Sequence, residues 1–320
     1  MTTILVSGAS GIIGYGILRS LRKVHENVTL IGTSIYTGTI AEHFSDIFEV
    51  APNTNDDGYI GWLDATIRKH AVDLVVPGIE IDMYKWSENL HEMSKNSRIF
   101  ALNRPELIAL CKDKWVFYGH LAKLNPAFVI DSSLDDNFDL LAERFGVPFI
   151  LKPRHGHAAR GIVRVADRTV FLAHRENIGK SLMSQALVGS DEEEYTVSVF
   201  GDGNGDYCAQ ISLRRRLSKD GYTDRAEVVK LDEAQDVLRE LCRYFRPLGP
   251  TNFQFRKHAG ALKLLEINPR ISSSTSMRTA FGYNESAMLV DFFLEKKLPR
   301  QPKLRYGEAV RYVEDLVSYK

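Results

Sequence analysis

The stretch PTNFQFRKHAGALKLLEINPRISSSTSMR, residues 250–278, carries the strongest pattern in the chain. It contains two runs in which polar and apolar residues alternate, joined by the short segment HAG. Side chains of a strand alternate between its two faces, so each run predicts a strand with one polar face. The polar residues are Asn252 and Gln254 in the first run and Glu266 and Asn268 in the second. A hairpin would bring the two polar faces together.

The polar residues of this predicted hairpin have the chemistry of a magnesium site. Amide and carboxylate oxygens from Gln254, Glu266 and Asn268 suit Mg²⁺ or Mn²⁺, which keeps several waters and bridges nucleotide phosphates. A hairpin with solvated polar residues is the alternative. However, a carboxylate inside the apolar run LKLLEINP is costly unless it is paired or metal-bound. Arg270 follows directly and could contact a phosphate oxygen on which charge develops.

The first third of the chain alternates between strand and helix patterns. Strands are predicted at residues 3–7, 28–33, 72–77 and 98–102, and helices at 12–21, 59–70 and 82–95. This alternation predicts a parallel, doubly wound α/β sheet over residues 1–103.

The pattern changes after residue 103. A helix is predicted at 105–123, then strands at 147–152 and 162–165 and a helix at 167–177. Short apolar or alternating runs at 182–187, 194–201, 206–213, 226–231, 251–256 and 261–267 predict one antiparallel sheet, with helices at 232–245 and 283–295. We therefore expect an α/β domain at 1–103, a smaller unit at 104–182 and an α+β unit at 183–320.

The overall composition excludes several classes of protein. The 41 Lys and Arg residues balance the 41 Asp and Glu residues, which argues against a nucleic-acid binder. No run of about 18 apolar residues predicts a membrane span. The three cysteines lie far apart, and the N-terminus lacks the basic region of a signal peptide. We expect a cytoplasmic protein.

The E-I-N-P-R segment, with N-F-Q-F upstream, resembles the metal and phosphate region of the ATP-grasp superfamily. It is most similar to ATP-grasp ligases of the carbamoyl-phosphate-synthase type. The resemblance implies a Rossmann-like pre-ATP-grasp domain followed by a two-lobed ATP-grasp domain. It also implies a carboxylate–amine ligase that acts on small molecules through an acyl phosphate, consumes MgATP and releases ADP and phosphate. A homodimer is one expected assembly.

The resemblance also implies roles for individual residues. Arg270 and Lys152 would neutralise charge during catalysis, and Gln254, Glu266 and Asn268 would hold the metal. Nucleotide contacts are expected from Lys114, Lys152, His155, Gly156, Gly161, Gln185, Ala186, Leu187, Val188, Glu194 and Asn252. Among these, Glu194 would bond the ribose hydroxyls, and Gln185 to Val188 would line the adenine. Arg214 and Arg216 lie in a basic cluster where relatives place substrate- or phosphate-binding arginines.

Two features of the N-terminal region suggest substrate contacts. Glu80 and Asp82 follow the strand at 72–77, at the edge where open α/β sheets bind ligands, and could hold an ammonium group. Alternatively, they are carboxylates that favour the start of a helix. Gly11 lies in a G-x-x-G-x-x-G turn that could hold an anion at the following helix N-terminus, or could simply permit a tight turn.

That glycine-rich turn leaves a second function open. It resembles the dinucleotide fingerprint of extended short-chain dehydrogenases, which would make the chain an NAD(P)-dependent dehydrogenase or epimerase. The second strand, however, ends in Gly32-Thr33-Ser34, without the carboxylate that usually binds the ribose. This reading also leaves residues 252–270 unexplained. A non-catalytic ATP-sensing protein is the third alternative, and the complete Glu266, Asn268 and Arg270 set argues against it.

Overall fold

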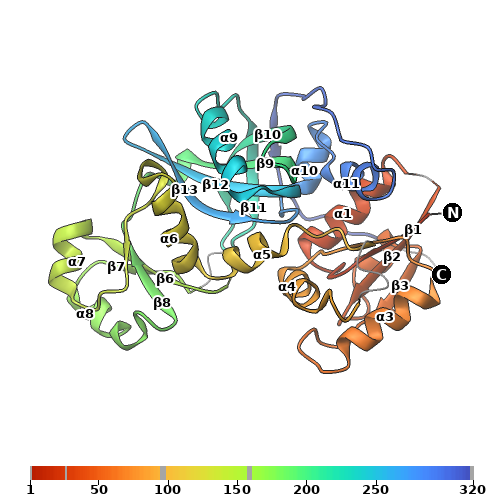
Figure 1. The fold of residues 1–320 in the computed structure, drawn as a ribbon, viewed down its shortest axis with the longest axis horizontal. Coiled ribbons are helices and arrows are strands. Elements are labelled where there is room, and N and C mark those ends of the chain that lie inside the picture. Colours follow the sequence, from red (N-terminus) through yellow and green to blue (C-terminus); the bar gives the residue numbers. More distant parts are fainter. Residues whose placement is uncertain (1, 26, 94–98, 157–160, 318–320) are drawn as a thin grey trace.

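The computed structural model describes residues 2–25, 27–93, 99–156 and 161–317. In these residues the strands form three sheets, which follow one another along the chain (Figure 1). A parallel sheet lies at one end of the molecule, a small antiparallel sheet at the other, and the largest sheet between them. The predicted fold class, α/β followed by α+β, is confirmed.

The N-terminal sheet is parallel, with strand order β3-β2-β1-β4. Its strands are β1 (Thr2–Val6), β2 (Val28–Ser34), β3 (Ile47–Val50) and β4 (Leu74–Val76). The helices of this region are α1 (Ile12–Arg22), α2 (Ala41–Phe44), α3 (Tyr59–Lys69) and α4 (Glu80–Asn89). The chain direction around the sheet reverses between β1 and β4, so the loops after these two strands border the crevice where such sheets bind ligands.

Two predictions for this region need correction. The segment at 98–102 is not a strand, because within its described part only Phe100 forms an isolated parallel bridge, to Val75. The short strand β3 was not predicted. Its residues are only partly buried and it lies at the edge of the sheet, so the apolar pattern is weak.

The helix predicted at 105–123 is instead two helices, α5 (Pro105–Lys112) and α6 (Lys114–Leu124). Asp113 separates them in an extended conformation (φ −116°, ψ 111°), and its carboxylate accepts hydrogen bonds from the backbone N–H groups of Trp115 and Val116. An aspartate in this position caps a new helix start. The break therefore places Lys114 at the first position of α6.

The small antiparallel sheet has the order β5-β8-β6-β7. It comprises β5 (Ser132–Ser133), β6 (Phe149–Pro153), β7 (Val163–Val165) and β8 (Leu182–Gln185), with helices α7 (Phe138–Phe145) and α8 (Arg168–Leu172). The helix predicted at 167–177 thus ends at Leu172 and is followed by a separate 3₁₀ turn. The segment at 182–187 was predicted in the large sheet, but β8 pairs with β5 and β6. The predicted domain boundary after residue 182 falls inside β8, and the three-domain division remains a prediction.

The large sheet has the order β13-β12-β9-β10-β11-β14. Its strands are β9 (Glu194–Asp202), β10 (Tyr207–Leu217), β11 (Thr223–Val228), β12 (Leu248–His258), β13 (Ala261–Asn268) and β14 (Glu308–Val310). The helices are α9 (Ala234–Phe245), α10 (Thr275–Ala280) and α11 (Glu285–Phe293). The predicted hairpin at 251–267 is confirmed as β12 and β13.

Apolar packing joins the N-terminal sheet to the large sheet. One buried cluster contains Ile17 and Leu18 of α1 together with Met277 of α10 and Leu289 of α11. Hydrogen bonds reinforce this contact, since Asn284 donates to the carbonyl of Ser20 over 2.8 Å. The small sheet has a separate core, centred on Phe149. Within the described residues, no helix has the length and apolar character needed to cross a membrane.

Candidate functional site

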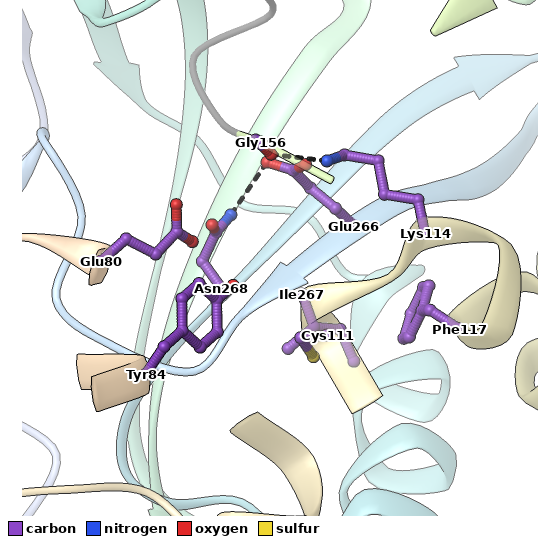
Figure 2. Close-up of a pocket in the computed structure, with 9 residues that line it drawn as sticks. All are labelled: Glu80, Tyr84, Cys111, Lys114, Phe117, Gly156, Glu266, Ile267 and Asn268. Atoms are coloured by element: carbon purple, nitrogen blue, oxygen red, sulfur yellow. Dashed lines mark hydrogen bonds between the residues drawn. The ribbon is translucent and has the colours of Figure 1, made fainter. Parts of the chain in front are cut away.

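A pocket lies where the N-terminal sheet, the start of α6 and the end of β13 meet (Figure 2). Its lining residues are Glu80, Tyr84, Cys111, Lys114, Phe117, Gly156, Glu266, Ile267 and Asn268. These residues come from all three parts of the fold. In Figure 2, Asn268 lies between Glu80 on one side and Glu266 on the other.

The β12–β13 register produces the polar face that alternation predicted. Asn252 pairs with Asn268, and Gln254 pairs with Glu266. A bulge follows, because the register shifts after Gln254. Leu264 consequently enters the apolar core with Ile267, and Leu265 is only partly buried. Bulges bend a strand locally and re-aim its side chains.

The end of β13 holds its three polar side chains in contact with one another. Asn268 Nδ2 donates to Glu266 Oε1 over 3.0 Å, and Arg270 Nη2 donates to Asn268 Oδ1 over 3.1 Å. Arg270 also donates through Nη1 to the carbonyl of Ile271, while its Nε is buried without a partner among the described residues. The pattern E-I-N-P-R therefore folds into a compact arrangement of one carboxylate, one amide and one guanidinium.

The two predicted lysines surround this carboxylate. Lys114 Nζ donates to the carbonyl of Gly156 over 2.6 Å, and Lys152 on β6 is only 8% exposed. Burial lowers the pKa of Lys152 to about 8, although nearby Glu266 opposes the shift. Burial alone would raise the pKa of Glu266. Its neighbours Lys114, Asn268 and Lys152 more than offset that effect, so the pKa lies below its ordinary value. Such charge compensation is typical of a site built for an anionic ligand.

The loop after β6 is described only in part. His155 is exposed, and its Nε2 lies 3.5 Å from Asp113 Oδ2. Gly156 and Gly161 have positive φ angles of 112° and 74°, which favour glycine at both ends of the loop. His157 lies outside the described residues, as do the next three residues of this predicted phosphate-covering loop.

The predicted adenine segment continues from β8. Gln185 is buried, and its Nε2 donates to Ser132 Oγ over 2.9 Å. The N–H of Ala186 donates to the carbonyl of Asp131. Leu187 and Val188 are partly exposed and do not line the pocket of Figure 2. The structure thus brings the lysines and the β13 residues together, and places the hinge segment outside that pocket.

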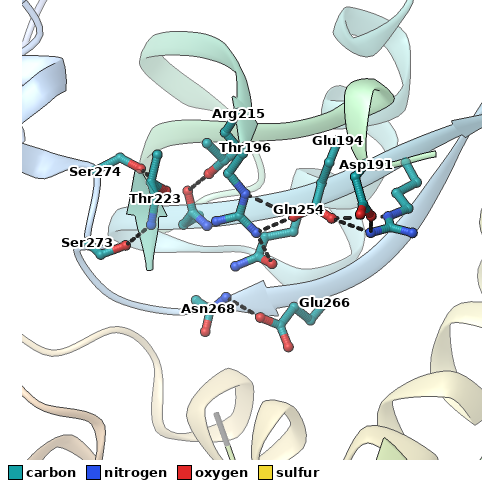
Figure 3. A network of polar contacts seen from close by, with 12 residues as sticks. Asp191, Glu194, Thr196, Arg215, Thr223, Gln254, Glu266, Asn268, Ser273 and Ser274 are labelled. Carbon is teal, nitrogen blue, oxygen red and sulfur yellow. Dashed lines mark hydrogen bonds and ion pairs between the residues drawn. The ribbon is translucent and has the colours of Figure 1, made fainter. Parts of the chain in front are cut away.

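Glu194, the predicted ribose ligand, has two arginine partners (Figure 3). Arg215 donates to its Oε1 at distances of 2.8 and 3.1 Å, and Arg256 donates to its Oε2 at 2.9 and 3.0 Å. Glu194 and Arg215 are each 5% exposed. A ribose hydroxyl would have to share oxygens that already accept charged hydrogen bonds, so the ribose role remains a prediction.

The side chains of Arg214 and Arg216 on β10 do not point into the pocket, where a substrate or phosphate contact was predicted for them. Arg214 pairs with Glu227, and Arg216 lies 3.5 Å from Glu192; both arginines are exposed. Arg215, which lies between them, faces inward. Alternation along the strand could have identified it, because Arg215 shares the face of the apolar Leu213. The structure therefore does not bring Arg214 and Arg216 to the pocket.

Glu80 and Asp82 also separate in the structure. Glu80 lines the pocket and lies 3.4 Å from Arg270 Nη2. Asp82 is 3% exposed, and its Oδ1 accepts a hydrogen bond from Thr54 over 2.6 Å inside the N-terminal region. Successive helical residues rotate around the helix axis, so two residues of one turn can face opposite sides. The predicted substrate contact of Asp82 is therefore corrected: its side chain does not reach the site.

Protein atoms pack closely against the glycines of the glycine-rich turn. A Cβ on Gly14 would lie 2.3 Å from the carbonyl oxygen of Gly8, and one on Gly8 would lie 2.3 Å from Ile79 Cγ2. The N–H of Gly11 donates to the carbonyl of Gly8, and the N–H of Ala9 donates to that of Thr33. These glycines permit close packing, and the two amides are already bonded. The geometry thus supports the tight-turn interpretation and does not favour a dinucleotide at Gly11.

The polar face of β12 and β13 continues from Gln254 to Asn252 into a fully buried polar network. Asn252 Oδ1 accepts hydrogen bonds from Thr196 and from Arg278, and Arg278 forms an ion pair with Glu285 at 3.1 Å. Asn252, Arg278 and Glu285 are each 0% exposed. Asn252 therefore lies in the interior in this structure, and its predicted nucleotide contact is not formed at the pocket surface. Sequence analysis did not identify Arg278 or Glu285.

The donor set at the end of β13 fits a magnesium ion bound together with a nucleotide. Glu266 Oε2 accepts no hydrogen bond from the described residues, and Asn268 adds an amide oxygen. Both amide oxygens already accept one hydrogen bond, Gln254 Oε1 from Arg215 over 2.7 Å and Asn268 Oδ1 from Arg270 over 3.1 Å, and of these two residues only Asn268 lines the pocket. No group of three or more His, Cys, Asp or Glu side chains in the described part of the chain could hold a metal ion. Mg²⁺ suits a site with few protein ligands, because phosphates and waters complete its shell.

Comparison with known proteins agrees with this geometry. Residues 183–316 match the family model "ATP-grasp in the biosynthetic pathway with Ter operon". The large chain of carbamoyl phosphate synthase from Methanosarcina mazei is 28% identical over 261 residues, which cover 72% of this chain and 24% of the relative. The corresponding protein of Methanosphaerula palustris is 26% identical and is matched over 83% of this chain and 26% of the relative. The chain thus spans about a quarter of the length of these curated relatives.

Solved structures show the same fold at low sequence identity. N5-carboxyaminoimidazole synthetase from Staphylococcus aureus superposes with a TM-score of 0.74 at 16% identity, covering 95% of this chain and 80% of that one. Biotin carboxylase from Campylobacter jejuni superposes with a TM-score of 0.71 at 15% identity, covering 96% and 74%.

These findings define the class of protein. The chain contains an ATP-grasp domain preceded by a Rossmann-like domain. It is homologous to part of the large chain of carbamoyl phosphate synthase.

Proposed function

We propose that this protein is an ATP-dependent ligase that joins a small-molecule carboxylate to an amine through an acyl phosphate. The observation that carries the proposal is that Glu266, Asn268 and Lys114 line one pocket, while Arg270 bonds to Asn268 and the charge of Lys152 acts on Glu266. Polyphosphate binding needs point charges, and metal binding needs hard oxygen ligands. Both occur here on elements from separate parts of the fold.

In the first step, a substrate carboxylate oxygen attacks the γ-phosphorus of ATP. A bond forms between this oxygen and phosphorus, and the bond to the β–γ bridging oxygen breaks, so ADP leaves with the electron pair. Lys114, Lys152 and Arg270 would hold the phosphate oxygens and neutralise the charge that spreads over them. Mg²⁺, held by Glu266 and Asn268 with Gln254 beside them, would supply further charge neutralisation.

In the second step, the amine nitrogen attacks the carbonyl carbon of the acyl phosphate. The C–N bond forms and the C–O bond to phosphate breaks. An amine that enters as ammonium loses two protons, one to the leaving phosphate and one to solvent. The protein's main contribution is to position the reactants and to exclude water, which would otherwise hydrolyse the acyl phosphate.

Trapping with hydroxylamine tests the proposal. The protein is incubated with MgATP, pooled small carboxylates and hydroxylamine, and both hydroxamate and ADP are measured. We expect carboxylate-dependent hydroxamate and ADP in equal amounts, and their loss in Lys152→Met. ATP binding without turnover with any carboxylate pool would instead indicate an ATP-sensing protein. Tight NAD(P) binding without ATP turnover would indicate the dehydrogenase alternative. Either result would overturn the ligase proposal.

A further inference from the structure

Arg215 brings a fixed positive charge to the polar face of the large sheet. It lies on β10 and is 5% exposed, so its guanidinium faces the interior. Its Nη2 donates to Gln254 Oε1 over 2.7 Å and to Glu194 Oε1 over 2.8 Å. In Figure 3, the amide of Gln254 lies between this guanidinium and Glu266, the carboxylate of the proposed magnesium site.

The charge of Arg215 acts on that carboxylate. Gln254 and Glu266 are partners in the β12–β13 register, and the side chains of such pairs are close neighbours. Burial alone would raise the pKa of Glu266, but Lys114, Lys152 and Arg215 are among the neighbours that more than offset it. Three protein cations therefore already act on the one carboxylate among the predicted metal ligands.

The other carboxylate and amide oxygens near the site accept hydrogen bonds from arginines. These contacts are made by Arg215 and Arg256 to Glu194, by Arg215 to Gln254, and by Arg270 to Asn268 and Glu80. Glu266 differs, because its Oε1 accepts from an amide and its Oε2 accepts no hydrogen bond from the described residues. This face thus presents a divalent ion with one carboxylate that no described arginine engages.

A guanidinium bonded to Gln254 occupies the region that a second divalent ion would need. Sites that hold two ions for phosphoryl chemistry place them about 3.5–4 Å apart. An ion on Gln254 Oε1 would lie about 2.1 Å from that oxygen, and therefore at most about 5 Å from Arg215 Nη2. Like charges at this separation repel strongly where water is excluded.

Two observations distinguish the amide of Asn268 from that of Gln254. Asn268 lines the pocket, whereas Gln254 does not. Glu194 also holds Arg215 in place, since it accepts from Nε over 3.1 Å and from Nη2 over 2.8 Å. Arg270, which bonds Asn268 over the longer distance of 3.1 Å, is the arginine that we expect to turn to phosphate when nucleotide binds.

We propose that Arg215 is a built-in cation that takes the place of a second divalent ion, so that the site binds one Mg²⁺ with each nucleotide, on Glu266 and Asn268. This inference rests on the MgATP site of the proposed function. Arg215 is accordingly a positioning residue: it keeps the oxygen of Gln254 engaged and adds positive charge beside Glu266.

The test counts ions in the whole protein. Mn²⁺ replaces Mg²⁺ and is titrated into protein with one equivalent of the non-hydrolysable ATP analogue AMP-PNP, while EPR measures free and bound Mn²⁺. For the wild type we expect one tightly bound Mn²⁺, without the spin coupling of two ions about 4 Å apart. Arg215→Gln should gain a second Mn²⁺, because the change removes a cation and frees the oxygen of Gln254. Arg225→Gln, an exposed arginine on β11, is the matched control and should keep one.

Each other outcome decides. Two tightly bound Mn²⁺ ions in the wild type would overturn the inference, as would a folded Arg215→Gln that still binds one. Because Arg215→Gln also loses a buried ion pair, thermal unfolding checks its fold, and Gln254→Glu provides a variant that retains this pair. Gln254→Glu should keep one ion, since Arg215 neutralises the new carboxylate, and a second ion there would contradict the proposal. Wild-type protein that binds no AMP-PNP would instead defeat the ligase function itself.

Discussion

The guanidinium of Arg215 donates to the amide oxygen of Gln254 over 2.7 Å. The same nitrogen, Nη2, donates to Glu194 Oε1 over 2.8 Å. A buried charge on β10 therefore fixes the orientation of an amide that sequence analysis placed among the metal ligands (Figure 3). An amide oxygen has two acceptor sites, and Arg215 uses one of them.

Removing Arg215 should destabilise the fold. Among the described residues, Arg215→Met leaves the buried Glu194 with Arg256 as its one remaining arginine partner. Breaking a buried ion pair in this way costs about 3 kcal/mol. Urea unfolding of Arg215→Met and Arg214→Met compares a buried with an exposed arginine of the same strand. We expect the Arg214 variant to remain within about 0.5 kcal/mol of wild type. Equal losses in the two variants would contradict the assigned burial.

The Arg278–Glu285 pair should show strong coupling. Both side chains are 0% exposed, so Arg278→Met leaves an unpaired buried carboxylate at a cost of about 3–5 kcal/mol. The double variant Arg278→Met/Glu285→Gln removes that charge and should recover part of the loss. A double-mutant cycle of unfolding free energies measures the coupling. Simple additivity of the two single changes would argue against the pair.

Glu266→Gln should abolish turnover while preserving the fold. The change removes the carboxylate that faces Lys114 and Lys152, and we expect MgATP turnover to fall at least about 100-fold. Initial rates over a range of Mg²⁺ concentrations, with thermal unfolding as the check on folding, measure the effect. Glu227→Gln on β11 provides a surface control, since Glu227 pairs with Arg214. Full activity in Glu266→Gln would refute the metal assignment.

Asp82 makes stability depend on pH. Burial raises its pKa above the ordinary 3.8, although hydrogen bonds from Thr54, Ser7 and Tyr59 oppose the shift. The folded state therefore favours the protonated acid. This contribution is fully present below pH 3.8 and is lost as the pH rises through the folded-state pKa. Relative to Asp82→Asn, the wild type should lose stability as the pH rises from about 4 through the raised pKa of Asp82.

Chemical unfolding of both proteins across that pH range provides the measurement. Asp57→Asn, in the same loop region as Thr54 but exposed, serves as the control and should show the wild-type pH dependence. A constant difference between the wild type and Asp82→Asn would show that the carboxyl is not perturbed.

Alanine substitution should lower the free energy of unfolding at Gly14 and raise it at Gly61. Gly14→Ala forces a Cβ to within 2.3 Å of the carbonyl oxygen of Gly8, so the turn must deform, and we expect a loss of about 1–3 kcal/mol. Gly61 lies within α3 with open space around its Cβ position. Alanine there should stabilise the protein by about 0.5–1 kcal/mol. Thermal unfolding of both variants decides, and a tolerated Gly14→Ala would refute the close packing of the turn.

Local periodicity was enough to predict the core of the site. The alternation in N-F-Q-F and E-I-N-P-R identified the hairpin and its polar face, because a period of two is set by the strand alone. The bulge after Gln254 escaped prediction, since nothing in the run LKLLE indicates which leucine leaves the core. Asp113 was also missed as a helix break, because apolar helical patterns continue on both sides of it and only its capping bonds end the helix.

The sequence predicted where charged residues lie along helices and strands better than it predicted which side chains they contact. Glu80 and Asp82 were equivalent in sequence, and the packing of α4 on the sheet separates them. Arg214, Arg215 and Arg216 look alike in a basic run, and the pairing of β10 decides that Arg215 faces inward. Long-range contacts also engage the predicted ribose and nucleotide residues, Glu194 and Asn252, with arginines distant in sequence.

The two lysines whose charges act on Glu266 are anchored in different cores. α6 carries Lys114, and its Phe117 and Leu121 pack with the helix and strands of the large sheet. Lys152 follows Leu151, which packs in the separate core of the small sheet. We call the small sheet (β5–β8) with its core the small lobe. A movement of this lobe away from the large sheet would carry Lys152 away from Glu266 and leave Lys114 in place. The bond from Lys114 to the carbonyl of Gly156 therefore spans the two lobes, and the electrostatic environment of Glu266 would report whether they are closed.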